Sequence, residues 1–247
     1  MGELESFDRL AGRPVADRLG AALAATCDPA AARLGLERWL VAAGNPSLYL
    51  QGLVESPDGV ERLTRVLAAS GPMTDALVRH PEDGTIFFEP PRSLRAPNRD
   101  GRLREARRIL GSATSYRHGL DRLRMLRTRW TLEVLDADLS DREAQWRLWR
   151  ELSQIAEVLI EATAEWAWRE TGSPGDLPVM IVGFGKLGGE ELNYSSDVDL
   201  VYVLPDEADE ATERAATKWA RLFGHAMEDR MGRGSIARVD LRLRPYG

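Results

Sequence analysis

The feature that most limits the possible folds of this chain is a single change of pattern near residue 171. Before that point, apolar residues recur at the three- and four-residue spacing of amphipathic helices. A breaker-rich cluster, Thr-Gly-Ser-Pro-Gly, occupies residues 171–175, and short β-branched apolar runs follow at 178–182 and 198–204. Helices and strands bury residues at different repeats, so the runs after residue 175 indicate strands that the first part lacks. The sequence therefore predicts an α+β protein, with a mostly helical region over residues 1–170 and an α/β domain with a small mixed sheet over residues 171–247.

Within the second part, the run at residues 178–182 is wholly apolar and predicts a buried strand. Residues 208–231 have the spacing of an amphipathic helix. Residues 236–243 alternate between apolar and charged side chains, which predicts a strand with one polar face. The seven tryptophans of the chain fall mostly at helical spacing, so we expect them in the core.

Composition excludes several classes of protein. The formal net charge is −6 at pH 7, whereas proteins that grip nucleic acid usually present a basic surface. No run approaches the roughly 18 apolar residues that a membrane-spanning helix needs. The acidic N-terminus has no apolar signal region, and one cysteine, Cys27, cannot form an internal disulfide framework. We expect a cytoplasmic protein without a nucleic-acid or membrane partner.

Two carboxylates, Asp197 and Asp199, stand two residues apart at the start of the run 198–204. Because side chains on a strand alternate between faces, both are expected to point the same way. Neighbouring carboxylates repel each other unless a cation lies between them, and rigid oxygen ligands suit Mg²⁺. Asp240, on the polar face of the strand predicted at 236–243, adds a third carboxylate. The sequence predicts that these three catalytic acids bind two Mg²⁺ ions.

A glycine-rich segment at residues 183–189, Gly-Phe-Gly-Lys-Leu-Gly-Gly, follows the first predicted strand. Glycines permit a close approach of the backbone, so their amides can cradle a phosphate, and a lysine adds positive charge. Serine hydroxyls precede the acid pair, and arginines near Asp240 can neutralise a transferring phosphoryl group. The predicted phosphate and nucleotide contacts are Gly183, Gly185, Lys186, Gly188, Gly189, Ser195, Ser196, Arg242 and Arg244.

Each of these elements has a simpler explanation when taken alone. The glycine-rich segment has neither the Gly-Lys-Ser/Thr ending of a Walker A loop nor the final glycine of the dinucleotide fingerprint. An Asp-x-Asp is commonly a solvated turn, and Asp240 alone is explained as a salt-bridge partner of Arg238 or Arg242. His80, His118 and His225 are scattered and are read as surface or capping residues. The order of strand, glycine-rich turn, Ser-Asp-x-Asp and a later acid is a much rarer combination than any of its parts.

This combination resembles the hydrophobic-Gly-Ser…Asp-x-Asp pattern of the polymerase-β-type nucleotidyltransferase superfamily, except that Lys186 replaces the usual small residue. A closer resemblance rests on residues 183–200, GFGKLGGEELNYSSDVDL, and on residues 238–246, RVDLRLRPY. These motifs are similar to those of the glutamine synthetase adenylyltransferase and adenylyl-removing enzyme family. Residues 77–82, the arginine-rich helix around 122–135 and residues 152–167 resemble the helical region of that family, so most of the chain is covered.

The resemblance implies a polymerase-β-like catalytic domain in which Asp197, Asp199 and Asp240 are the metal-binding catalytic acids. It implies Mg²⁺-dependent transfer of an adenylyl group, with glutamine synthetase as the protein substrate and ATP, ADP and phosphate as substrates or products. A PII-type signalling protein is an implied regulatory partner. Family members carry one domain that removes AMP from a tyrosine of glutamine synthetase by phosphorolysis, giving ADP, and one that adds AMP from ATP. The motifs here look more like the removing half.

Three alternatives remain open at this level. The chain could adenylylate glutamine synthetase instead, since both directions share one site design. It could be a non-catalytic module that only binds a partner protein. It could also transfer nucleotides to RNA or a small metabolite, although the acidic balance argues against RNA. The family's catalytic domain normally continues past the Arg-Leu-Arg-Pro motif, so we expect a truncated domain.

Overall fold

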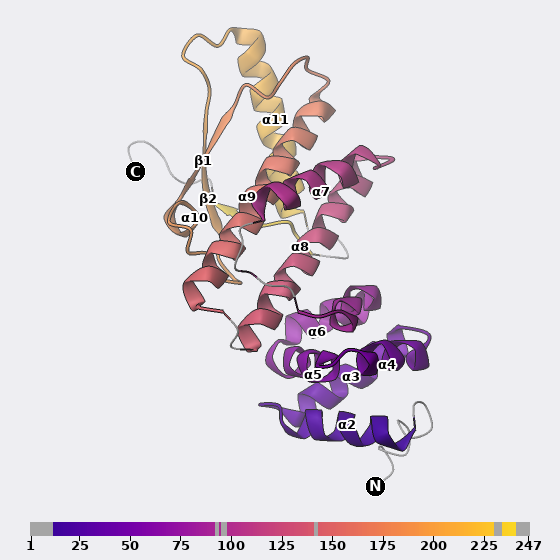
Figure 1. The fold of residues 1–247 in the computed structure, drawn as a ribbon. Coiled ribbons are helices and arrows are strands. Elements are labelled where there is room, and N and C mark those ends of the chain that lie inside the picture. Colours follow the sequence, from indigo (N-terminus) through magenta and orange to yellow (C-terminus); the bar gives the residue numbers. More distant parts are fainter. Residues whose placement is uncertain (1–11, 92–93, 95–97, 141–142, 230–233, 241–247) are drawn as a thin grey trace. The chain divides into compact units, whose positions relative to one another are not determined.

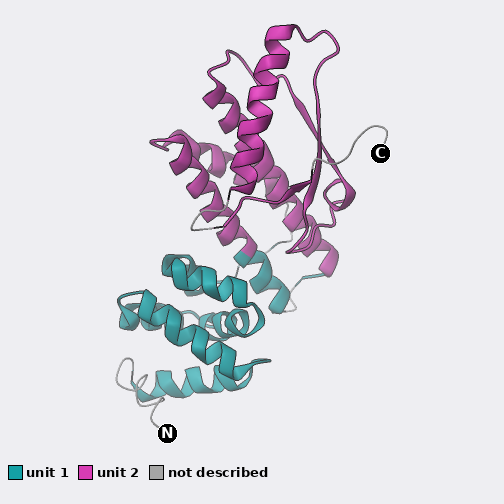
Figure 2. Cartoon of the chain, turned by 180° about the vertical axis from the view of Figure 1, so that it is seen from behind, with its two compact units in different colours: residues 1–94, 132–144 teal, residues 95–131, 145–247 magenta. Residues whose placement is uncertain are grey.

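The structure is a computed structural model that describes residues 12–91, 94, 98–140, 143–229 and 234–240. The chain divides into two compact units (Figure 2). Unit 1 comprises residues 1–94 and 132–144, and unit 2 comprises residues 95–131 and 145–247. Among the described residues, none of the helices is long and apolar enough to cross a membrane.

Unit 1 is helical, and three of its described helices begin where the sequence supplies a capping side chain. The side chains of Asp28, Asn45 and Ser70 accept hydrogen bonds from the amides of the residues three positions on. A proline at the first or second helical position follows each cap and fixes a helical φ. The elements are α2 (Arg13–Ala24), α3 (Pro29–Ala42), α4 (Pro46–Glu55), α5 (Gly59–Ala69), α6 (Gly71–Arg79) and the 3₁₀ helix η1 (Pro81–Phe88).

The core of unit 1 collects one face of each of these helices around Trp39, Leu63 and Phe87, which are fully buried. One charged pair lies inside it. Arg62, 2% exposed, contacts Asp136 at 2.9 Å between Nη2 and Oδ2, and it also donates to the carbonyl of Glu89. A buried guanidinium is tolerated only because carboxylate and carbonyl oxygens satisfy its N–H groups.

Unit 2 joins helices to a small sheet (Figure 1). Its helices are α7 (Arg99–Gly111), residues 116–131 of α8 (Tyr116–Leu139), α9 (Gln145–Thr171), the short α10 (Gly185–Gly188) and α11 (Glu210–Glu228). Its strands are β1 (Met180–Phe184), β2 (Val198–Val203) and β3 (Val239–Asp240). In the described residues the sheet has the order β1-β2-β3, with β1 antiparallel and β3 parallel to β2. The predicted α+β class with a small mixed sheet is confirmed.

The two faces of this sheet have different surroundings. On one face, Tyr202 packs against Trp219 and Phe223 of α11, with ring centroids 5.1 and 5.8 Å apart. The indole of Trp219 also donates to the carbonyl of Ala164 in α9, so α9 and α11 meet behind this face. Residues of the other face include Met180 and Val203, which are 66% and 44% exposed.

Two expectations about burial are therefore wrong. The first strand is not buried on both sides, because the helices of the described ranges cover one face of the sheet and leave residues of the other exposed. The strand also runs to Phe184 rather than ending at residue 182. Trp146 and Trp149, at the start of α9, are 54% and 36% exposed, whereas the other five tryptophans are buried. The predicted domain boundary near residue 170 stays a prediction. Helices α7 and α9 belong to the same compact unit as the sheet.

Candidate active site

Two of the three predicted acids meet across neighbouring strands. Asp199 on β2 and Asp240 on β3 are register partners, although 41 positions separate them in the sequence. Residues that are paired across adjacent strands point to the same face of a sheet. Asp199 and Asp240 therefore lie on the same face, next to each other, as the prediction of a shared site requires.

Asp197 lies immediately before β2 and is held by an arginine. Its Oδ1 is 2.6 Å from Nε of Arg238, and Nη2 of Arg238 donates to the carbonyl of Ser195 at 2.7 Å. The amide of Val198 donates to the carbonyl of Arg238 at 2.9 Å. These three contacts fasten the segment before β3 to the segment before β2, which helps fix the register that pairs Asp240 with Asp199. Arg238, considered earlier as a partner of Asp240, pairs with Asp197.

The glycine-rich turn touches the same carboxylates. Gly185 has φ +56°, a left-handed conformation that side chains rarely adopt. A Cβ built on Gly185 would overlap Oδ2 of Asp199. Two independent reasons therefore favour glycine at residue 185. The backbone angle is one that other residues rarely adopt, and a side chain would collide with the carboxylate of Asp199, which lies against the turn.

Most of the glycine-rich segment folds into α10 and its C-terminal turn. The amides of Gly189, Glu190 and Glu191 donate to the carbonyls of Gly185, Leu187 and Lys186 at 2.9–3.1 Å. Leu187 is buried beneath the turn, whereas the side chain of Lys186 is exposed. The amides of residues 189–191 already donate within the turn. Any backbone amide that could bind a phosphate therefore lies nearer Gly185. The phosphate-binding role of Gly183, Gly185, Gly188 and Gly189 stays a prediction.

The two serines before the acid pair belong to a tight turn centred on Asn193. The amide of Ser195 and the hydroxyl of Ser196 both donate to Oδ1 of Asn193 at 3.0 Å. The hydroxyl of Ser196 also accepts from the amide of Asn193 at 3.1 Å. The Ser196 hydroxyl thus stabilises the loop that delivers Asp197, and any contact of Ser195 or Ser196 with a nucleotide remains a prediction.

The three acids are of the right chemical type to bind a divalent cation, but their side chains are not arranged to hold one in this structure. Carboxylate oxygens are the ligands that Mg²⁺ prefers, and Asp199 and Asp240 stand side by side. Asp197, however, is engaged by Arg238, and no group of three His, Cys, Asp or Glu side chains within the described residues is arranged to hold a metal ion. Binding through all three acids would use Oδ2 of Asp197, or Oδ1 after release of Arg238. Arg242 and Arg244 lie outside the described residues.

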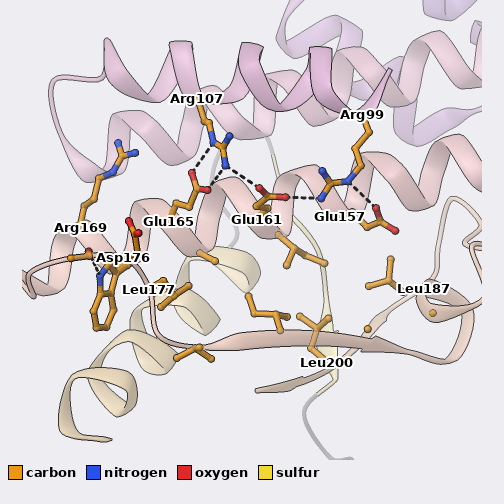
Figure 3. Close-up of a pocket in the computed structure, with 18 of the residues that line it drawn as sticks. Arg99, Arg107, Glu157, Glu161, Glu165, Arg169, Asp176, Leu177, Leu187 and Leu200 are labelled. Carbon is orange, nitrogen blue, oxygen red and sulfur yellow. Dashed lines mark hydrogen bonds and ion pairs between the residues drawn. The ribbon is translucent and has the colours of Figure 1, made fainter. Parts of the chain in front are cut away.

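A cavity of about 810 Å³ lies behind the sheet, on the face opposite to the carboxylates (Figure 3). Its apolar wall comes from the sheet face that carries Ile181 and Leu200 and from Leu187 of the turn. Its charged wall is a ladder between α7 and α9, in which Arg99 and Arg107 both contact Glu161 (Figure 3). Arg99 also contacts Glu157, and Arg107 also contacts Glu165.

The sequence patterns described above do not predict this cavity. A signal was available, because Glu157, Glu161 and Glu165 recur every fourth residue and so share one face of α9. That spacing does not predict that arginines from another helix would pair with these acids above a sheet.

Comparison with known proteins identifies the family of this chain. A family model described as glutamate-ammonia ligase adenylyltransferase matches residues 60–247. A bifunctional glutamine synthetase adenylyltransferase/adenylyl-removing enzyme of Burkholderia mallei (strain ATCC 23344) is 32% identical over 213 residues, covering 84% of this chain and 23% of the relative.

Proteins of the same name give similar figures. That of Pseudomonas aeruginosa (strain PAO1) is 33% identical over 247 residues, 91% of this chain and 25% of the relative. That of Bordetella bronchiseptica (strain RB50) is 30% identical over 234 residues, 92% of this chain and 25% of the relative. The chain thus spans about a quarter of the length of these relatives. With three quarters of its residues matched by the family model, this chain belongs to the glutamate-ammonia ligase adenylyltransferase family.

Proposed function

We propose that this chain carries a Mg²⁺-dependent adenylyl-transfer site whose protein substrate is glutamine synthetase. The proposed reaction is phosphorolytic removal of AMP from an adenylylated tyrosine. The observation that carries the proposal is the pairing of Asp199 with Asp240 beside the left-handed Gly185. Family membership supports the substrate class, since the relatives are named for glutamine synthetase and for both directions of transfer.

In this reaction an oxygen of inorganic phosphate forms a bond to the phosphorus of the adenylyl group. The bond between that phosphorus and the tyrosine oxygen breaks, and the tyrosine oxygen takes up a proton. The products are ADP and unmodified tyrosine, so atoms and charge balance without an oxidant or reductant. The protein's task is to position two anionic groups and to lower the repulsion between them.

The described residues divide this task between them. Asp199 and Asp240 would hold Mg²⁺, and Asp197 would join them on releasing Arg238. When bound, Mg²⁺ supplies positive charge to the reacting phosphoryl group. Arg238, freed from Asp197, is a second cation at the same edge of the sheet. The turn at Gly185 keeps the backbone against the carboxylate of Asp199, which occupies the place that a side chain at residue 185 would take.

The removing direction is preferred because the segments Asn193-Tyr-Ser-Ser and Arg238-Val-Asp-Leu-Arg-Leu-Arg-Pro-Tyr look more like the removing half of the family. Adenylylation by ATP is the alternative at the same site. The two directions differ only in which phosphate compound is offered, so one preparation tests both. A PII-type signalling protein as a further partner stays a prediction.

The test incubates this chain with adenylylated glutamine synthetase, Mg²⁺ and inorganic phosphate, and measures ADP release. A parallel reaction with unmodified glutamine synthetase and ATP measures incorporation of AMP. Asp199→Asn should lower the rate by about 100-fold or more, because a charge that holds the reacting groups is lost. Asp206→Asn is the matched control, since Asp206 is exposed in the loop after β2.

The proposal predicts ADP release that Asp199→Asn abolishes and Asp206→Asn leaves unchanged. AMP incorporation without ADP release would reverse the assigned direction and keep the site. Equal rates for Asp199→Asn and the parent chain would remove the site assignment. Partner binding without turnover in either reaction would favour a non-catalytic module.

A further inference from the structure

Phe184 is the last residue of β1 and stands beside the predicted catalytic carboxylates. It is the register partner of Asp199 in the antiparallel pair of β1 and β2. Paired residues on antiparallel strands share a face, with Cβ atoms about 4.5–5.5 Å apart. The ring of Phe184 therefore lies on the carboxylate face, within one side-chain length of Asp199. It also directly precedes Gly185, whose backbone approaches the same carboxylate.

The ring of Phe184 is open to solvent. Its exposed fraction is 46%, although it belongs to a strand whose alternate residues face a packed layer. The helices α9 and α11 pack behind the opposite face through Tyr202 and Trp219. An exposed large aromatic residue beside paired carboxylates has no evident role in the packing of the described residues. Met180 and Val203 are also exposed on this face, and a group of exposed apolar residues, unlike a single one, often marks a binding surface.

The carboxylate face also has an ordered polarity across the sheet. Asp240, Asp199 and Phe184 lie side by side on β3, β2 and β1 at one end of the face, next to the glycine-rich turn. Met180, the exposed residue at the start of β1, lies further along the same face. A ligand that fits this order has an anionic group at one end and a flat apolar ring next to it. A nucleotide has that construction, with a phosphate joined through ribose to an aromatic base.

We propose that the ring of Phe184 is the stacking platform for the purine base of the nucleotide handled at this site. The inference rests on the proposed function, because that function places a phosphate beside Asp199. Stacking on a ring recognises the flat surface of a base and not the groups at its edge. Phe184 should therefore favour purines over pyrimidines because of their larger ring area, and should contribute equally to adenine and guanine.

The experiment measures the dissociation constants of ADP, UDP and inorganic pyrophosphate for this 247-residue chain by titration calorimetry, in buffer of constant Mg²⁺. Phe184→Ala should weaken ADP binding by about 5- to 150-fold, the range found when an aromatic residue under a base is truncated. It should weaken UDP binding less, and it should leave pyrophosphate binding unchanged. Phe184→Trp should retain ADP binding.

Val203→Ala is the matched control. Val203 is a comparably exposed apolar residue on the same face, four residues along β2 from Asp199, or about 13 Å. It should leave ADP binding unchanged. Circular dichroism should show the same helix and strand content for all variants, since both substituted side chains are largely exposed.

Several results would overturn the platform. They are no ADP binding by the parent chain, unchanged ADP binding in Phe184→Ala, or an equal loss of pyrophosphate binding. A loss confined to O-phosphotyrosine, tested in the same way, would assign the ring to the tyrosyl side of the reaction instead. Failure of the proposed function would give a different result. In that case ADP binding would still depend on Phe184, but Asp199→Asn would leave the rate of adenylyl transfer unchanged.

Discussion

Replacing Gly185 by alanine tests whether the glycine-rich turn and Asp199 form one unit. The substitution adds one methyl group at a residue whose φ is +56°, and that methyl group points at Oδ2 of Asp199. Gly224→Ala adds the same methyl group inside α11, where a Cβ would meet no atom within 4 Å. The two variants therefore make the same chemical change in opposite structural settings.

The expected magnitudes follow from these settings. A left-handed conformation costs a non-glycine residue about 1–2 kcal/mol, and moving the Asp199 side chain off its rotamer costs about 0.5–1.5 kcal/mol. Alanine loses less chain entropy than glycine on folding, which returns roughly 0.4–1 kcal/mol. Gly185→Ala should therefore lower the free energy of unfolding by about 0.5–3 kcal/mol. Gly224→Ala should raise it by up to about 1 kcal/mol, because alanine is the better helix former.

The measurement is urea denaturation followed by tryptophan fluorescence, since Trp219 is fully buried against the sheet. Only the transition that reports on Trp219 is compared. Gly185→Ala should also reduce adenylyl transfer by about 100-fold, because a displaced Asp199 no longer holds the reacting groups in place. Shifts of the same sign in both variants, or full activity in Gly185→Ala, would refute the contact between turn and carboxylate.

Two further predictions concern stability. Asp136→Ala should lower the free energy of unfolding of unit 1 by about 3–5 kcal/mol in urea denaturation, because it strands the buried charge of Arg62. Arg214→Ala breaks an exposed ion pair and should change stability by less than about 0.5 kcal/mol, so equal effects of the two would contradict the assigned burial cost. Burial, with a smaller contribution from Glu170, raises the pKa of Tyr116 to about 12. The folded chain thus holds this proton more tightly than the unfolded chain, whose tyrosine pKa is about 10. The contribution of Tyr116 to stability is complete below pH about 10 and is lost as the pH rises to about 12. Tyr116→Phe should therefore flatten the dependence of the free energy of unfolding on pH between these values, as measured by denaturation. An unchanged dependence on pH would contradict this prediction.

Local patterns predicted the elements of the site well. The β-branched runs correspond to β1 and β2, and the amphipathic spacing at 208–231 corresponds to α11 over Glu210–Glu228. Alternation along a strand placed Asp199 on the face of β2 opposite to Leu200 and Tyr202, because the side-chain repeat of a strand is fixed by its backbone. The strand predicted at 236–243 is described only at Val239–Asp240, since residues 241–247 lie outside the described part.

Long-range partners were beyond such patterns. Arg238 was equally plausible as a partner of Asp240, and its ion pair with Asp197 depends on how the segments before β2 and β3 are fastened together. Likewise, an apolar run predicts a strand without saying how many of its faces another layer covers. Met180 is exposed because α9 and α11 lie on the opposite side of the sheet.

The sequence by itself determined which segments form the main helices and strands, where the glycine-rich turn stands, and that Asp199 lies on the face of β2 opposite to Leu200 and Tyr202. These are properties of backbone repeats and of single residues over a few positions. Only the tertiary structure decided that Asp240 stands beside Asp199, that Gly185 leaves room for that carboxylate, and that Phe184 is open beside them. Strand register and layer packing join residues that are dozens of positions apart, and no local repeat encodes which of them meet.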